Sequence, residues 1–147
     1  MPDSANRLSC TLNSACDCIH VLSSMVELMG HRVGLSDKQT NRMVLGVDEL
    51  FANIAQHGYQ GREGQVDMSA SCENDVLQFE LRDYAAPLLD EKALEGGEYT
   101  DECELSPGGR GLQLMHAVMD SVEHQALSNG NRWRLLKNIH GEKNDES

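Results

Sequence analysis

Residues 47–59 read VDELFANIAQHGY, and this stretch decides the fold because it defines the core face of a long helix. At 100° per residue, the apolar side chains of such a helix gather on one side, which we expect to pack on the core. That side consists of Val47, Leu50, Phe51 and Ile54. Glu49 and Asn53 are four residues apart, so they stack together on a different face of the helix.

The pairing of Glu49 with Asn53 suits a base beside a magnesium ligand, and Gly46 and His57 fall on nearly the same side. Magnesium prefers oxygen donors and usually keeps several waters, so one amide oxygen plus phosphates suffices to hold it. The alternative is a solvated polar face. Gly46 favours the site, because a glycine within a helix costs about 1 kcal/mol relative to alanine.

The residues before this helix predict a further helix. Residues 1–10 are polar and predict at most a short leading strand, whereas apolar residues recur with a helical period over residues 12–29. Gly30 interrupts that period. Ser36 is a suitable cap for the next helix, which we expect over about residues 37–57.

A β-hairpin is predicted after the long helix. Residues 66–72 and 77–81 alternate apolar and polar side chains, and Glu73-Asn74-Asp75 between them supplies turn residues. Asp83 shares the parity of the apolar residues in the second strand, so a carboxylate lies on the face expected to point inward. A buried carboxylate needs hydrogen-bond donors, and a ligand is one source of them. The alternative is that Asp83 only starts the turn at Tyr84.

Residues 84–107 lack a sustained period and carry seven acidic side chains, which predicts an irregular loop. Gly108-Gly109-Arg110-Gly111 then opens a third helix. Free N–H groups at a helix start attract anions, and glycines let a phosphate approach the backbone. Arg110 adds a charge suited to phosphate oxygens. The alternative is an ordinary glycine-rich helix entry.

A second hairpin is predicted near the end of the chain. Residues 122–127 and 133–137 flank Ser128-Asn129-Gly130-Asn131, where Asn-Gly favours a tight turn. Residues 141–147 predict a solvated tail. The order of helices, hairpin, loop, helix and hairpin indicates an α+β fold in one domain over residues 1–140.

Composition narrows the class of protein. The chain has 147 residues, 12 Lys and Arg and 24 Asp and Glu, for a net charge of −12. Such an acidic balance argues against a nucleic-acid backbone or an anionic membrane as the main partner. No stretch is apolar enough for a membrane span or a leader. The five cysteines are an odd, scattered set, typical of free thiols in a reducing cytosol.

The order of these features resembles the Bergerat ATP-binding fold. Glu49-x-x-x-Asn53, Asp83 at a strand end, a long loop and Gly109-x-Gly111 at a helix start follow one another as in that fold, over roughly residues 8–137. Within it, VDELFANIAQHGY and PGGRGLQLMHAVMD are similar to the N box and the glycine box of the anti-sigma factor serine/threonine kinases. The resemblance implies a two-layer sandwich with helices on one face of a mixed, mainly antiparallel sheet.

The resemblance also implies a role for each matching residue. Glu49 is the general base that prepares a Ser or Thr hydroxyl, Asn53 holds Mg²⁺ against the phosphates, and Asp83 accepts a hydrogen bond from the adenine amino group. Residues 84–107 form the ATP lid. The phosphates meet Gly108, Gly109, Arg110 and Gly111. Catalysis then depends on positioning and charge neutralisation.

Three features depart from the family pattern. The Asp-x-Gly motif is Asp83-Tyr84-Ala85 here, so Ala85 places a methyl where close approach to adenine is expected, and weaker binding follows. The last strand reads Arg132-Trp133-Arg134, without the threonine that the family often places near the aspartate. The lid carries seven carboxylates against Lys92.

The family resemblance implies a cytoplasmic homodimeric protein kinase that uses ATP and Mg²⁺. Its substrate is then a small anti-sigma factor antagonist of the STAS type, and phosphorylation switches binding between this antagonist and a sigma factor or another regulator. The alternative, motivated by Ala85 and the acidic lid, is a non-catalytic module that sequesters a protein partner. Neither function involves direct contact with nucleic acid or a membrane.

Overall fold

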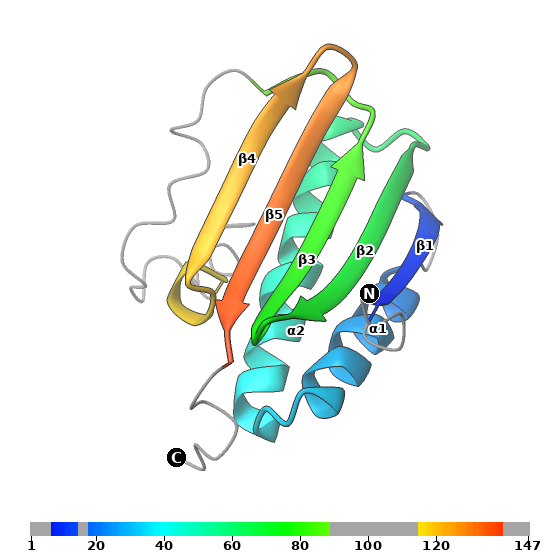
Figure 1. Ribbon diagram of the computed structural model, residues 1–147. Coiled ribbons are helices and arrows are strands. Elements are labelled where there is room, and N and C mark those ends of the chain that lie inside the picture. Colours follow the sequence, from blue (N-terminus) through cyan, green and yellow to red (C-terminus); the bar gives the residue numbers. More distant parts are fainter. Residues whose placement is uncertain (1–6, 15–17, 89–114, 140–147) are drawn as a thin grey trace.

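The computed structural model describes residues 7–14, 18–88 and 115–139, which form one sheet and the helices that cover it (Figure 1). The N-terminal half holds strand β1 (Arg7–Asn13), helix α1 (Ile19–Arg32), helix α2 (Asp37–Asn53) and a π-helical turn, η2 (Ile54–Gly58). The remaining strands are β2 (Gln65–Glu73), β3 (Val76–Asp83), β4 (Ser121–Leu127) and β5 (Gly130–Asn138).

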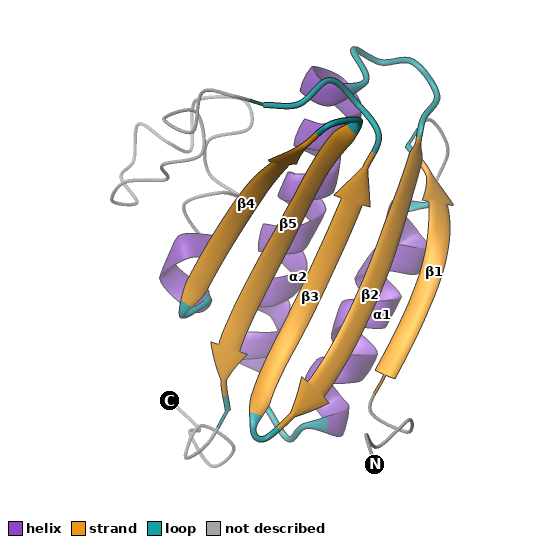
Figure 2. Ribbon diagram, turned by 45° about the horizontal axis from the view of Figure 1, so that its top comes forward, coloured by secondary structure: helices purple, strands orange, loops and turns teal. Residues whose placement is uncertain are grey.

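The five strands form a sheet in the order β1-β2-β3-β5-β4, and α1 and α2 lie on the same face of it (Figure 2). The two-layer α+β fold is thereby confirmed. Each neighbouring pair of these strands is antiparallel, so the described sheet is not mixed. Among the residues that the structure describes, no helix is long and apolar enough to cross a membrane.

The first helix differs from its prediction at both ends. Leu12 belongs to β1, where it pairs with Val66 of β2, so the predicted helical start at residue 12 is wrong. Pairing with a distant strand outweighs the local period there. Gly30 does not end the helix either, since α1 continues to Arg32. A Cβ at Gly30 would lie 2.6 Å from Thr40 Oγ1, so this glycine allows α1 to approach α2 closely.

The second helix begins as predicted. The Ser36 side chain accepts a hydrogen bond from the Gln39 N–H at 3.2 Å, which satisfies one free donor of the first turn. At its other end α2 passes into η2, where the Tyr59 N–H donates to the carbonyl of Ile54, five residues earlier, at 2.9 Å. Such π-helical turns are rare and often occur at functional sites.

Both predicted hairpins are present. Asn74 and Asp75 connect β2 to β3 with φ angles of 53° and 61°, as a tight hairpin turn requires. Ser128 and Asn129 connect β4 to β5. The inward residues of β3 are all buried, as their parity predicts, and they are Leu77, Phe79, Leu81 and Asp83.

Candidate nucleotide site

A cavity of about 310 Å³ lies on the helix-covered side of the sheet, at the end of α2. Its walls come from α2, η2, the facing ends of β3 and β5, and residues 86–88, and they include Asn53, Asp83 and Trp133. Most of the lining is apolar, with a few converging polar groups, which is typical of a small-molecule site. The structure thus brings Asn53 and Asp83, which are 30 positions apart in the sequence, to one cavity.

Asp83 is the buried charge at this site, with 1% of its surface exposed. Its Oδ1 accepts hydrogen bonds from the Ala85 N–H and from Asn131 Nδ2, both at 3.0 Å. Its Oδ2 accepts one from Trp133 Nε1 at 2.9 Å. These donors compensate for the loss of water around the buried carboxylate. Protein groups therefore supply the partners that the sequence analysis had sought from a ligand.

Asn131 links the strand ends to the segment that follows β3. Its Oδ1 accepts hydrogen bonds from the Leu88 N–H and, with the ring proton on that nitrogen, from His124 Nε2, both at 2.8 Å. Its Nδ2 donates to the Ala86 carbonyl at 3.1 Å as well as to Asp83. Asn131 is directly opposite Asp83 in the pairing of β5 with β3. The network holds residues 86–88 against the sheet.

A second set of contacts fixes the start of the same segment. The Tyr59 hydroxyl donates to the Gln65 carbonyl at 2.5 Å and accepts from the Tyr84 N–H at 2.7 Å. The Tyr84 hydroxyl donates to Asp67 Oδ2 at 2.5 Å, and this bond is the main reason that the pKa of Tyr84 is raised. The guanidinium of Arg82 lies 4.2 Å from the centre of the Tyr84 ring.

Glu49 and Asn53 lie one turn apart on α2, and both are half-buried. Asn53 lines the cavity, whereas Glu49 is not among its lining residues. Within the described ranges, neither side chain makes a hydrogen bond or an ion pair. His57, on η2, lines the cavity beyond Asn53.

The structure bears on the interpretation of two small residues, Gly46 and Ala85. A Cβ at Gly46 would lie 3.0 Å from the Cβ and 3.1 Å from the Cα of Met115, so the gap left by Gly46 is occupied by the short helix of residues 115–118 rather than by a ligand. Ala85 is buried next to Gly58, and Ala86 rather than Ala85 lines the cavity. That Ala85 weakens adenine binding stays a prediction.

Part of the predicted site lies outside the described residues. This part comprises the glycine box Gly108, Gly109, Arg110 and Gly111, most of the lid predicted at 84–107, and the tail 141–147. Of the lid, the structure describes only residues 84–88.

Sequence reasoning missed the residues that surround Asp83. Asn131 was assigned to a turn, and Trp133 was placed only in the last strand. Trp133 is buried, with 6% exposure, and it donates to Asp83. The alternation Asn131, Trp133, Leu135 along β5 was a usable signal, since it places all three on the inward face of the sheet.

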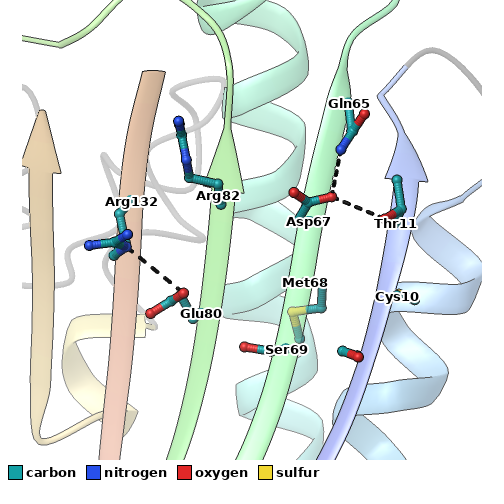
Figure 3. A pocket seen from close by; sticks show the side chains of 10 residues that line it. Cys10, Thr11, Gln65, Asp67, Met68, Ser69, Glu80, Arg82 and Arg132 are labelled. Atoms are coloured by element: carbon teal, nitrogen blue, oxygen red, sulfur yellow. Dashed lines mark hydrogen bonds and ion pairs between the residues drawn. The ribbon is translucent and has the colours of Figure 1, made fainter. Parts of the chain in front are cut away.

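A wider hollow of about 500 Å³ lies on the helix-free face of the sheet (Figure 3). Its polar groups bind one another: Asp67 Oδ1 accepts from Thr11 at 3.1 Å and from Gln65 at 2.9 Å, and Arg132 lies 3.9 Å from Glu80. Because these charges already have partners, the cavity at Asp83 is the better candidate for ligand chemistry.

The fold and the site define an ATPase-type domain, and comparison with known proteins agrees. Residues 12–137 match the model of the family "histidine kinase-like ATPase domain", so the chain belongs to this family. A solved histidine kinase domain, from the blue-light activated histidine kinase of Erythrobacter litoralis EL346, has the same fold, with a TM-score of 0.57 at 18% identity. The match covers 88% of this chain and 64% of that one.

The individual proteins to which this chain is similar include a serine-protein kinase and an anti-sigma factor. The serine-protein kinase RsbW of Bacillus subtilis (strain 168) is 30% identical over 119 residues, 78% of this chain and 74% of RsbW. The anti-sigma F factor of Halalkalibacterium halodurans is 33% identical over 78 residues, and the match spans about half the length of that protein, 53%. Membership of the anti-sigma factor kinase family, expected from the N box and the glycine box, is confirmed.

Proposed function

We propose that this protein binds ATP with Mg²⁺ and transfers the γ-phosphoryl group to a serine or threonine of a protein partner. The observation that carries the proposal is the cavity that buried Asp83 and the amide of Asn53 line together. The name of one relative, serine-protein kinase, supports the same activity.

Each residue has one task in this proposal. Asp83 accepts a hydrogen bond from the adenine amino group, and the apolar walls of the cavity enclose the base. The hydroxyl oxygen of the partner attacks the γ-phosphorus while its proton passes to the carboxylate of Glu49. The bond to the bridging oxygen breaks, and ADP leaves. The protein contributes positioning and electrostatics, as is general for phosphoryl transfer. The phosphates are assigned to Gly108, Gly109, Arg110 and Gly111.

The residues present fit magnesium. Among the described residues no group of three or more His, Cys, Asp and Glu could hold a metal alone. Mg²⁺ usually binds one or two protein oxygens together with phosphates and waters. Asn53 lines the cavity with its amide and would hold the ion, which neutralises phosphate charge when bound.

By family resemblance, the substrate is an anti-sigma factor antagonist of the STAS type, and a sigma factor or another regulator is the second partner. We also propose that the protein acts in the cytoplasm as a homodimer, which sedimentation equilibrium of the purified protein would test. Phosphorylation of the antagonist then switches which partner is bound.

A non-catalytic, partner-sequestering module is the second candidate function. The observation that favours it is the charge of residues 84–107, where seven carboxylates stand against one lysine. These charges oppose an anionic ligand unless a cation offsets them. Under this alternative, substitutions of Glu49 and Asn53 leave the regulatory effect of the protein unchanged.

Calorimetric titration with a non-hydrolysable ATP analogue tests the proposal. We expect binding that needs magnesium and that Asn53→Ala removes, because Asn53 holds the ion. Asn41→Ala is the matched control, since Asn41 is an exposed asparagine near the other end of α2. Absence of binding by the unmodified protein at millimolar nucleotide would overturn the proposal and leave the sequestering module.

Glu49→Ala tests the chemical step separately. We expect nucleotide binding to persist while transfer of labelled phosphate to a co-encoded antagonist falls below detection, because the variant has no group to accept the hydroxyl proton. Glu27→Ala, at an exposed position of α1, is the control. Full transfer by Glu49→Ala would exclude Glu49 as the base.

A further inference from the structure

We propose that Trp133 is a specificity-determining residue for the nucleobase, because its indole N–H leaves Asp83 with a single acceptor position for a base donor. The inference rests on the proposed function and deepens it. Trp133 lies on β5, which is the strand next to β3 in Figure 1. It both lines the cavity and donates to Asp83 Oδ2.

The first step is a count of acceptor positions on Asp83. A carboxylate offers about four lone-pair positions. Two on Oδ1 are taken by the Ala85 N–H and by Asn131 Nδ2, and one on Oδ2 is taken by Trp133 Nε1. Among the described residues no donor occupies the fourth position, on Oδ2, and Asp83 lines the cavity.

The second step concerns the direction of that remaining position. An indole N–H only donates and cannot rotate independently of its ring, whereas a hydroxyl both donates and accepts. The Trp133 ring is held against the His124 ring, with centroids 4.5 Å apart and planes at 48°. The indole therefore fixes the orientation of Oδ2, and the free lone pair keeps one direction.

The third step is what the free position can recognise. A base with an amino group at its 6-position can donate to Oδ2, whereas a base with a 6-oxygen would set acceptor against acceptor. A ligand that leaves a buried polar group without a partner binds much more weakly than one that supplies the partner, so the site discriminates strongly between these two bases. Trp133 has a single donor, its indole N–H, which is already given to Asp83, so this residue offers the 6-oxygen no compensating hydrogen bond.

The test pairs one substitution with two nucleotides. Trp133→Phe keeps an aromatic ring but removes the donor to Asp83. The probes are ATP and purine riboside triphosphate, which lacks only the 6-amino group. We expect the unmodified protein to prefer ATP, and we expect this preference to fall about tenfold or more in Trp133→Phe, as for loss of an oriented bond to a charged group. Affinity for purine riboside triphosphate should stay within about twofold of its original value.

Arg134→Ala is the matched control. Arg134 is the next residue on β5, but it points to the helix-free face, where its Nε lies 3.0 Å from Glu80. The preference for ATP should not change in this variant. A Trp133→Phe variant that loses affinity for both nucleotides equally would show a structural role only, and it would overturn the inference.

A measurement on the unmodified protein covers the case in which Trp133→Phe does not fold. Trp133 is the single tryptophan of the chain, so its indole N–H gives one assignable resonance in a ¹⁵N-correlated NMR spectrum. ATP should shift this resonance further than purine riboside triphosphate does, because the amino group shares Oδ2 with the indole. Equal shifts would overturn the inference alone, whereas no binding of either nucleotide would overturn the proposed function as well.

Discussion

At the residue scale, Asp48 is a carboxylate whose loss of hydration on folding is not fully compensated by its contacts in the protein. It lies half-buried on α2, and Ser23 Oγ of α1 donates to its Oδ1 at 2.7 Å. Burial raises the pKa of Asp48, and the Ser23 hydrogen bond and the nearby His20 lower it by less. The folded protein therefore holds the proton of Asp48 more tightly than the unfolded chain does.

This imbalance predicts that Asp48→Asn stabilises the protein at neutral pH. A folded pKa above the unfolded value of 3.8 means that stability falls as the pH rises from the unfolded to the folded pKa, and the loss persists above both. Asparagine removes that loss and still accepts from Ser23. Urea denaturation should show a gain at pH 7 that disappears below the ordinary aspartate pKa.

Glu27→Gln provides the comparison, because it replaces a carboxylate by an amide at an exposed position of α1. An Asp48→Asn variant that is less stable at pH 7 would show that the charged form of Asp48 contributes favourably.

Asp83 illustrates what could and could not be predicted from single residues. Alternation along residues 77–83 was sufficient to place its carboxylate on the inward face. Its donors Asn131 and Trp133 were not predictable, because they depend on the register of β5 against β3. Alternation defines the face of each strand, but it does not define which residues lie opposite one another across residues 84–129.

At the element scale, the β4–β5 hairpin meets β3 at Gly130. This glycine has a φ of 149°, and a Cβ there would overlap the Asp83 carbonyl oxygen and the guanidinium of Arg82. Gly130→Ala should therefore lower the free energy of unfolding by about 2–4 kcal/mol, from steric overlap together with backbone strain. Urea denaturation measures this loss.

Gly61→Ala separates the two causes. Gly61 also has a positive φ, 78°, but no atom lies within 4 Å of the position of its Cβ. Only the backbone penalty of about 1 kcal/mol applies there. If both variants lost the same free energy of unfolding, steric overlap with Asp83 would make no contribution to the loss at Gly130.

Local patterns predicted most elements, and the exceptions have physical causes. Both hairpins and the capped start of α2 follow from short-range signals such as Ser36 and the Asn74-Asp75 turn. Leu12 was assigned to a helix because its pairing with Val66 bridges more than 50 residues. The π-helical turn η2 was not foreseen, since a period of 100° per residue assumes an α-helix throughout.

At the scale of the whole molecule, the net charge of −12 predicts that salt stabilises the fold. Self-repulsion is greater in the compact state than in the unfolded chain. Raising the ionic strength from about 10 mM to about 150 mM shortens the screening length from about 30 Å to about 8 Å. The free energy of unfolding measured in urea should therefore rise over this range.

Sodium and potassium chloride should act alike, because screening depends on ionic strength alone. A fall in stability with either salt would mean that attractive pairs, such as that of Arg134 with Glu80, outweigh the repulsion. The arrangement of the sheet with both helices on one face was predicted at this scale, by family resemblance. Its antiparallel character throughout the described strands was not.

The strand order has a consequence for how the chain assembles. The hairpins β2–β3 and β4–β5 have tight turns, so each can form from contacts that are local in the sequence. Strands β3 and β5 are far apart in the sequence, so their pairing requires a larger loss of chain entropy. The bond between Asp83 and Asn131 lies on that seam. The cavity therefore forms only when the β2–β3 and β4–β5 hairpins pair with each other. A molecule bound in the cavity therefore contacts both hairpins and should slow their separation. The expected result is a lower unfolding rate in its presence.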